Sequence, residues 1–236
     1  AIAVVPFAWE GTGAAPVDMA AVIDADLTRS GQFAPVARTD MLGLPSTEQE
    51  VFYRDWRALE TEYLLIGRIS TPPGAGIRID YELFDVLKQS RVFYGYESGP
   101  ARDARMLAHR VADKIYAHLT GIPGAIATRL LYVSAARGGE GAKDYYRLTL
   151  ADSDGAQPVV LLESREPLLA PAWSPDGKHI AYVSFETGRP AIFRQELVTG
   201  KREQLTNFQG LNSGPAWSPD GKTLAMVLSK DGNPEI

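Results

Sequence analysis

The sequence predicts two domains: a small N-terminal α/β domain, with a mixed sheet and helices, followed by an incomplete all-β propeller. Residues 1–121 alternate short apolar runs with segments whose apolar residues recur at helical spacing. In residues 128–236 strand-like segments and turn residues replace the helices, and one motif is repeated. We therefore expect the domain boundary between Gly121 and Thr128, where the stretch Gly121-Ile122-Pro123-Gly124 ends the helical pattern.

The start of the chain predicts one strand and two helices, with a further short strand at residues 33–36. Residues 2–7 form an apolar run, which is typical of a strand buried on both faces. A helix is expected to begin after Pro16 and to stop at Gly31, because its apolar residues recur every four positions. Ser46 and Gln49 have the spacing of a capping box, which indicates a second helix with one apolar face made of Phe52, Trp56 and Leu59.

The rest of this domain predicts a hairpin, a third strand and a long helix. Residues 63–69 and 77–84 are strand-like and flank the loop Pro72-Pro73-Gly74-Ala75-Gly76. A strand at residues 92–97 is expected next. A helix over residues 102–119 then places its apolar side chains on one stripe: Ala104, Leu107, Ala108, Val111, Ile115 and Leu119.

An internal repeat is the most informative feature of the second half. The residues Pro-Ala-Trp-Ser-Pro-Asp-Gly-Lys begin at position 171 and recur unchanged from position 215, a period of 44 residues. Four strands are expected within this period, at residues 172–174, 180–185, 192–197 and 204–208, which corresponds to one propeller blade. Turn chemistry alone explains the Ser-Pro-Asp-Gly segments, and we expect Trp173 and Trp217 to fill the gaps between blades.

The propeller is expected to be incomplete. Strands at residues 130–135, 145–150 and 158–162, separated by turns at 138–141 and 152–155, predict an earlier blade that lacks its Trp-Ser-Pro-Asp-Gly strand. With the start of a third blade the chain offers about two and a half blades, whereas a closed ring takes about four to eight. We therefore expect the sequence to end inside a blade of a longer propeller.

Composition and motifs argue against several classes of function. The chain has 24 Lys and Arg against 29 Asp and Glu, a net charge of -5, and no basic run, which disfavours nucleic-acid binding. It contains no cysteine, and no apolar run is long enough to span a membrane. His109, His118 and His179 form no metal-binding motif, and no nucleophile elbow or phosphate-binding loop occurs. We predict no catalytic residue, no cofactor and no metal ligand.

Three further features occur together in this chain. They are an AVVPF-type strand followed by a Gly-rich stretch and a helix led by Pro16, a Leu119-Thr120-Gly121-Ile122 junction, and the repeated Pro-Ala-Trp-Ser-Pro-Asp-Gly motif. In this combination the sequence resembles the TolB family, a periplasmic component of the Tol-Pal system of Gram-negative bacteria. The resemblance runs across essentially the whole chain. It implies a six-bladed propeller in the full-length protein and a monomeric, non-enzymatic adaptor.

The resemblance also implies partners in the cell envelope. The propeller is expected to bind the lipoprotein Pal and thereby to be peripheral to the outer membrane, an N-terminal segment is expected to bind TolA, and colicins are expected to capture the protein. The implied roles are outer-membrane integrity, invagination at cell division, colicin import and protein transport. The TolA-binding segment is expected to precede Ala1, and the missing blades to follow Ile236, so both are expected to lie outside this sequence.

The resemblance places the Pal-binding face on the loops just before each Pro-Ala-Trp strand. In this sequence these loops supply Leu168, Leu169, Ala170, Leu211, Asn212, Ser213 and Gly214. Exposed leucines at 168, 169 and 211 would suit a partner surface, and Asn212 and Ser213 offer hydrogen bonds. Alternatively, the leucines fold under the rim of the blade.

Two other functions remain open from the sequence. The first is the propeller portion of a serine peptidase, which would need a hydrolase domain with a nucleophile elbow after Ile236. The second is a propeller that binds small molecules on its axis, which would need a convergent set of polar side chains on the inner strands.

Overall fold

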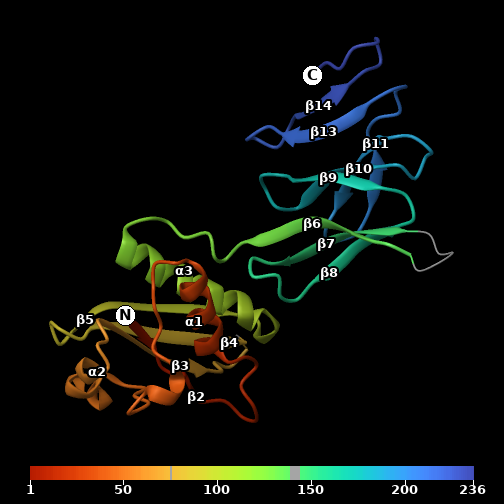
Figure 1. The fold of residues 1–236 in the computed structure, drawn as a ribbon. Coiled ribbons are helices and arrows are strands. Elements are labelled where there is room, and N and C mark those ends of the chain that lie inside the picture. Colours follow the sequence, from red (N-terminus) through yellow and green to blue (C-terminus); the bar gives the residue numbers. More distant parts are fainter. Residues whose placement is uncertain (75, 139–143) are drawn as a thin grey trace. The chain divides into compact units, whose positions relative to one another are not determined.

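The computed structural model describes residues 1–74, 76–138 and 144–236. The chain forms two compact units, Ala1–Thr128 and Arg129–Ile236 (Figure 1). Ala75 of the expected hairpin loop, and residues 139–141 of the expected turn in the first blade, lie outside the described residues.

A five-stranded mixed sheet forms the base of the N-terminal unit. β1 (Ile2–Val4) and β2 (Ala8–Trp9) pair in parallel with β3 (Tyr63–Ser70), which continues as an antiparallel meander into β4 (Ile77–Asp85) and β5 (Ser90–Gly99). The predicted hairpin and third strand are confirmed. The expected strand at residues 33–36 is only a single bridge between Ile2 and Pro35, in which Ile2 N donates to Ala34 O (3.3 Å) and Val36 N donates to Ile2 O (2.9 Å).

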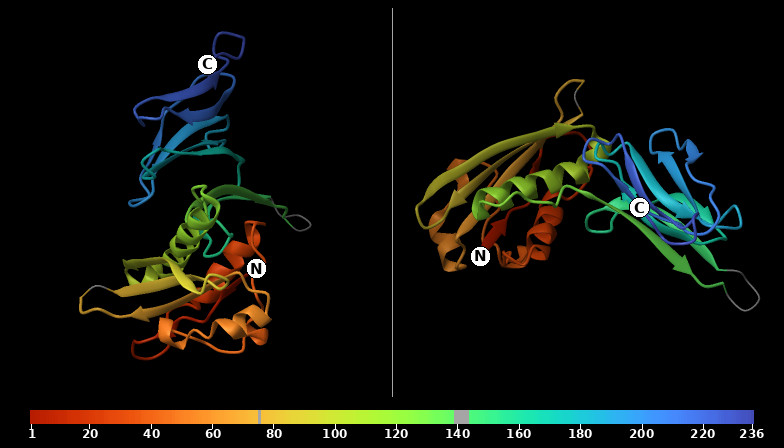
Figure 2. Two further views of the ribbon diagram at one scale, coloured as in Figure 1. Left: turned by 90° about the vertical axis from the view of Figure 1, so that its left-hand side faces the viewer. Right: turned by 90° about the horizontal axis from the view of Figure 1, so that it is seen from above.

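Two helices cover one face of this sheet. α1 (Met19–Arg29) begins at Asp18, whose side chain accepts a hydrogen bond from Ala21 N (3.1 Å). α3 (Ala104–Thr120) follows the short 3-10 turn η3 (Ala101–Asp103) and ends where Gly121 takes a φ of 73°. Figure 2 shows α1 and α3 side by side against the sheet. Their predicted apolar stripes are confirmed, since they bury the largest core of the unit, which includes Ile23, Leu27, Leu107, Val111 and Ile115.

The second predicted helix is wrong in length. A separate 3-10 turn, η2 (Glu48–Glu50), precedes a six-residue helix, α2 (Tyr53–Ala58). The capping box consists of Thr47 and Glu50, so the prediction of Ser46 and Gln49 is wrong by one residue. The Glu50 carboxylate accepts hydrogen bonds from the backbone N–H groups of Ser46 (2.7 Å) and Thr47 (3.3 Å), and the box closes on η2 instead of opening a long helix. Trp56 is buried in a second core on the opposite face of the sheet from α1 and α3, whereas Phe52 is exposed.

The described residues of the second unit form three antiparallel sheets. β6 (Arg129–Ala136), β7 (Tyr145–Asp152) and β8 (Val159–Ser164) form the first. β9 (Leu168–Trp173), β10 (His179–Ser184), β11 (Ala191–Glu196) and β12 (Arg202–Gln204) form a four-stranded blade in that order. β13 (Asn212–Trp217) and β14 (Leu224–Leu228) form a two-stranded sheet. The predicted incomplete propeller is thus confirmed.

The repeated Ser-Pro-Asp-Gly segments are tight turns held by their own side chains. Ser174 Oγ donates to Asp176 Oδ1 (2.6 Å) and accepts from His179 N (2.9 Å), and Ser218 and Asp220 make the same bond in the next repeat. The bond from Ser174 keeps the pKa of Asp176 below its ordinary range. Trp173 is half-buried against the core of the second unit. The geometry that the two turns share is therefore explained by hydrogen bonds within each turn.

Candidate partner-binding surface

The two strands that carry the repeated motif share a β-bulge at the same repeat position. Between β9 and β10 the register shifts between the pairs Leu169–Val183 and Ala172–Ala181. Between β13 and β14 it shifts between Ser213–Val227 and Ala216–Ala225. Inside the bulges, Ala170 has a φ of 46° and Gly214, its equivalent in the next repeat, a φ of 59°. A bulge bends its strand and re-aims the neighbouring side chains, so both repeats present an altered strand start.

We call the exposed part of these strand starts the rim, which comprises Leu169, Ala170, Leu211, Ser213 and Gly214. Leu169 is 48% exposed and Leu211 40%. Ala170 and Gly214 are also exposed, and Ser213 is half-buried. Because β13 lies against β9 in the same unit, the rim residues of the two repeats belong to neighbouring sheets.

Two residues of the predicted face are not accessible, and the expectation that they are exposed is wrong. Leu168 is 0% exposed and packs in the core with Leu148, Ile180 and Tyr182. It is the first residue of β9 and not part of a loop, so the alternation of the strand directs it inward while Leu169 faces outward. For this residue the alternative, a leucine under the blade rim, holds.

Asn212 is also fully buried, and its side chain serves the loop that precedes it. Its Nδ2 donates hydrogen bonds to the backbone oxygens of Phe208 (2.9 Å) and Gly210 (3.3 Å). The amide of Leu211 donates to Ser229 Oγ (2.7 Å). Asn212 therefore holds the loop in shape from beneath instead of offering a hydrogen bond to a partner.

Sequence reasoning missed one exposed aromatic side chain beside the rim. Phe208 was expected inside a strand, but β12 already ends at Gln204, and Phe208 is 42% exposed with Lys230 Nζ 5.4 Å from its ring centroid. Beyond the end of β12, the side chain of Thr206 replaces a backbone acceptor: its Oγ1 accepts a hydrogen bond from Ile192 N of β11 (2.9 Å). Phe208 and Lys230 add an aromatic ring and a cation to the apolar rim.

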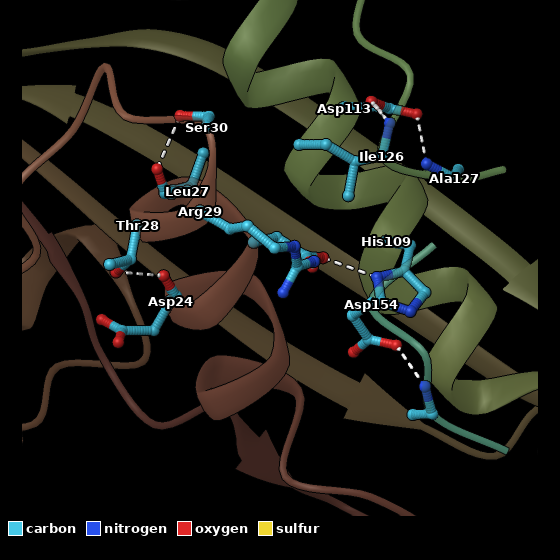
Figure 3. Close-up of polar contacts among 12 residues, drawn as sticks. Asp24, Leu27, Thr28, Arg29, Ser30, His109, Asp113, Ile126, Ala127 and Asp154 are labelled. Carbon is cyan, nitrogen blue, oxygen red and sulfur yellow. Dashed lines mark hydrogen bonds and ion pairs between the residues drawn. The ribbon is translucent and has the colours of Figure 1, made fainter. Parts of the chain in front are cut away.

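A buried polar cluster lies between α1 and α3 in the N-terminal unit (Figure 3). His109 Nδ1 donates to Asp26 Oδ2 (2.6 Å), and Arg29 binds the other oxygen of the same carboxylate. The cluster joins the two helices within their packed face, where a buried carboxylate needs such partners.

Within either unit taken alone, the described residues contain no group of three His, Asp or Glu side chains close enough together to hold a metal ion. No helix in the described part of the chain has the length and apolar character needed to cross a bilayer.

Comparison with known families identifies the chain. Residues 1–92 match the family described as "TolB amino-terminal domain", and residues 116–236 match "TolB beta propeller domain". The chain belongs to the TolB family. The resemblance inferred from the sequence is thereby confirmed.

Individual TolB proteins show how far the similarity extends. The Tol-Pal system protein TolB of Pseudomonas syringae pv. syringae (strain B728a) is 53% identical over 211 residues, which is 89% of this chain and 48% of that protein. TolB of Marinomonas sp. (strain MWYL1) is 52% identical over 212 residues, 89% of this chain and 49% of that protein. The crystal structure of TolB from Acinetobacter baumannii superposes with a TM-score of 0.84 at 40% identity, covering 99% of this chain and 56% of that one. The chain thus spans about half the length of the curated relatives it matches.

Proposed function

We propose that the chain belongs to a non-enzymatic periplasmic adaptor of the Tol-Pal system, which binds the lipoprotein Pal through the propeller rim. The observation that carries this proposal is that two neighbouring repeats each expose a leucine where the motif-bearing strand begins: Leu169 beside the first bulge and Leu211 just before β13. Exposed apolar groups that gather on one surface are typical of protein interfaces.

The backbone of the rim supports this role because it is already ordered. Leu169 and Leu211 lie on strands or directly beside them, and the Leu211 amide and the preceding loop are fixed by Ser229 and Asn212. A surface held in its binding shape loses little conformational entropy when a partner docks, which favours affinity. The proposed contact set is therefore Leu169, Ala170, Leu211, Ser213 and Gly214, with Leu168 and Asn212 supporting it from inside.

The wider assignment follows from family membership and is part of the same proposal. In the longer protein, a segment before the first strand binds TolA, colicins capture the propeller, and the adaptor acts in outer-membrane integrity and cell division. The rim contains no nucleophile paired with a base, which favours binding over catalysis.

The test is to measure binding of purified Pal to the full-length protein by isothermal titration calorimetry, with Leu211→Asp as the decisive variant. A carboxylate at this position has to be desolvated against an apolar partner, so we expect the affinity for Pal to fall by about 10-fold to 100-fold. The matched control is Val198→Asp, because Val198 is apolar and 88% exposed in the turn after β11. Thr199→Asp in the same turn is a second control.

The controls lie at the other end of the blade. Leu197 N donates to Lys178 O (2.9 Å), so the turn after β11 lies beside the Ser-Pro-Asp-Gly turn and away from the start of β9. Equal losses in Leu211→Asp and Val198→Asp, or a loss only in the controls, would show that the wrong face has been chosen. Failure of the wild-type protein to bind Pal, or hydrolysis of peptides by it, would refute the adaptor function itself.

A further inference from the structure

A half-open cavity of about 740 Å³ lies beside α1 in the N-terminal unit. Its walls are mainly apolar and include Val4, Ala20, Phe33, Val36 and Met41. The volume is in the range of about 300 to 1,000 Å³ that is typical of sites for small organic ligands. The polar groups of the lining indicate which ligand chemistry suits it.

Asp24 places a carboxylate without a partner in this cavity. Its backbone oxygen accepts from Thr28 Oγ1 (2.8 Å), but its carboxylate oxygens make no hydrogen bond or ion pair with any residue that the structure describes. Burial raises the pKa of Asp24, and the attraction of Arg38 only partly opposes this effect. In Figure 3 the carboxylate lies on the side of α1 away from His109, so the buried polar cluster does not serve it.

The nearby cations are already engaged with other carboxylates. Arg38 Nη2 lies 3.0 Å from Asp18 Oδ1 and 2.9 Å from Asp18 Oδ2, and Arg29 binds Asp26. Asp24 is therefore a partly desolvated negative charge on an apolar wall. Desolvation without compensation is unfavourable, and a cationic group with an apolar body would relieve it.

We propose that this cavity binds an organic cation, an ammonium or guanidinium group carried on an apolar chain. The cationic group pairs with the Asp24 carboxylate in a charge-assisted hydrogen bond, and the chain lies against Phe33, Val36 and Met41. The lining carries two charged groups, Asp24 and Arg38, and Arg38 is already paired with Asp18. The carboxylate of Asp24 therefore selects a cation over an anion, and the apolar walls select an alkyl or aryl body over a hydrated metal ion.

The test is a titration of the full-length protein with n-hexylammonium chloride, followed by the methyl NMR signals of Met41 and Ala20. The comparators are 1-hexanol and sodium hexanoate, which have the same chain with a neutral and an anionic head group. A charge-assisted hydrogen bond contributes enough that we expect hexylammonium to bind about 10-fold or more tightly than hexanol. Hexanoate should bind more weakly than both.

Asp24→Asn tests the role of the carboxylate directly. The amide has nearly the same shape and removes a desolvated charge, so the variant should fold at least as stably as the wild type at neutral pH. It should lose the roughly 10-fold preference for hexylammonium over hexanol. The control Asp40→Asn, at an exposed position in the 3-10 turn η1 (Arg38–Asp40) outside the lining, should keep that preference.

Three results would overturn the proposal. The first is a titration in which hexylammonium shifts no methyl signal of the cavity. The second is an Asp24→Asn variant, folded by circular dichroism, that still prefers hexylammonium as the wild type does. The third is preferential binding of hexanoate, which would assign the cavity to anions held by Arg38.

Discussion

Replacing Asp113 by Asn should release the segment that follows α3. The Asp113 carboxylate accepts hydrogen bonds from the backbone N–H groups of Ile126 and Ala127, each 2.8 Å long and each to a different oxygen (Figure 3). Gly124 lies so close that a Cβ there would clash with Asp113. The carboxylate therefore fixes the path along which the chain returns beside the helix after Gly121.

The size of the effect follows from the change in acceptors. An asparagine keeps one acceptor oxygen, but its NH₂ group faces the second backbone N–H and cannot accept from it. A hydrogen bond to a charged group contributes about 1.5 to 3 kcal/mol, so losing one should destabilise the segment locally by roughly 2 kcal/mol. This corresponds to about a 30-fold increase in the population of the opened segment.

Amide hydrogen exchange measured by NMR on the full-length protein gives a direct assay. Protection of the Ile126 and Ala127 amides should fall by about 30-fold in Asp113→Asn, while that of amides in the middle of α3 should not change. Asp103→Asn is the matched control, because the Asp103 carboxylate only lies 3.9 Å from Arg102 at the start of the same helix. Unchanged protection in Asp113→Asn, or an equal loss in Asp103→Asn, would refute the reasoning.

Two further predictions concern the two bulges and the dependence of the free energy of unfolding on pH in the acid range. Ala170→Gly should stabilise the propeller unit by about 1 kcal/mol and Gly214→Ala should destabilise it by a similar amount, because only glycine adopts a positive φ without steric cost. Urea unfolding measures the free energy of unfolding of both variants. Changes of the same sign in the two variants would contradict this account. The hydrogen bond from Arg78, supported by Tyr94, lowers the pKa of Asp80 below its ordinary value of 3.8. Its stabilisation is therefore fully present above that value and is lost as the pH falls through the lower folded-state pKa. Asp80→Asn should cost about 1 kcal/mol at pH 7 and progressively less as the pH falls below 3.8. Urea unfolding over this pH range measures the cost, and a pH-independent cost would exclude this linkage.

Features that depend on local chemistry were predictable from the sequence. The apolar stripe of α3 follows from its helical period, and burial confirms it. The hairpin of β3 and β4 follows from two strand-like runs that flank a Pro- and Gly-rich loop. The blade was predictable because each Ser-Pro-Asp-Gly turn closes on its own residues, for example Ser174 with Asp176. A turn motif that is repeated in the sequence therefore predicts a repeated structural unit.

Features that depend on register or on distant partners were not predictable. The side of the sheet that Leu168 faces depends on where β9 begins and on its bulge at Ala170, and alanine gives no sign of a positive φ. Asp26 and His109 lie 83 positions apart, so only the packing of α1 on α3 reveals that they meet. The open carboxylate of Asp24 is likewise defined by which neighbours have taken other partners.

The repeated bulge has a consequence for how binding specificity can change in a repeat protein. Each bulge is accommodated by its own pair of strands, and the adjacent Ser-Pro-Asp-Gly turn closes without help from the rim. Alanine stands at one bulge and glycine at the equivalent position of the next, while both repeats have the same turn. The exposed residues of each repeat can thus be changed without changing the strands and turns that support them. A library diversified at residues 169–170, 211 and 213–214, with the buried Asn212 kept, would present new recognition surfaces on the same scaffold.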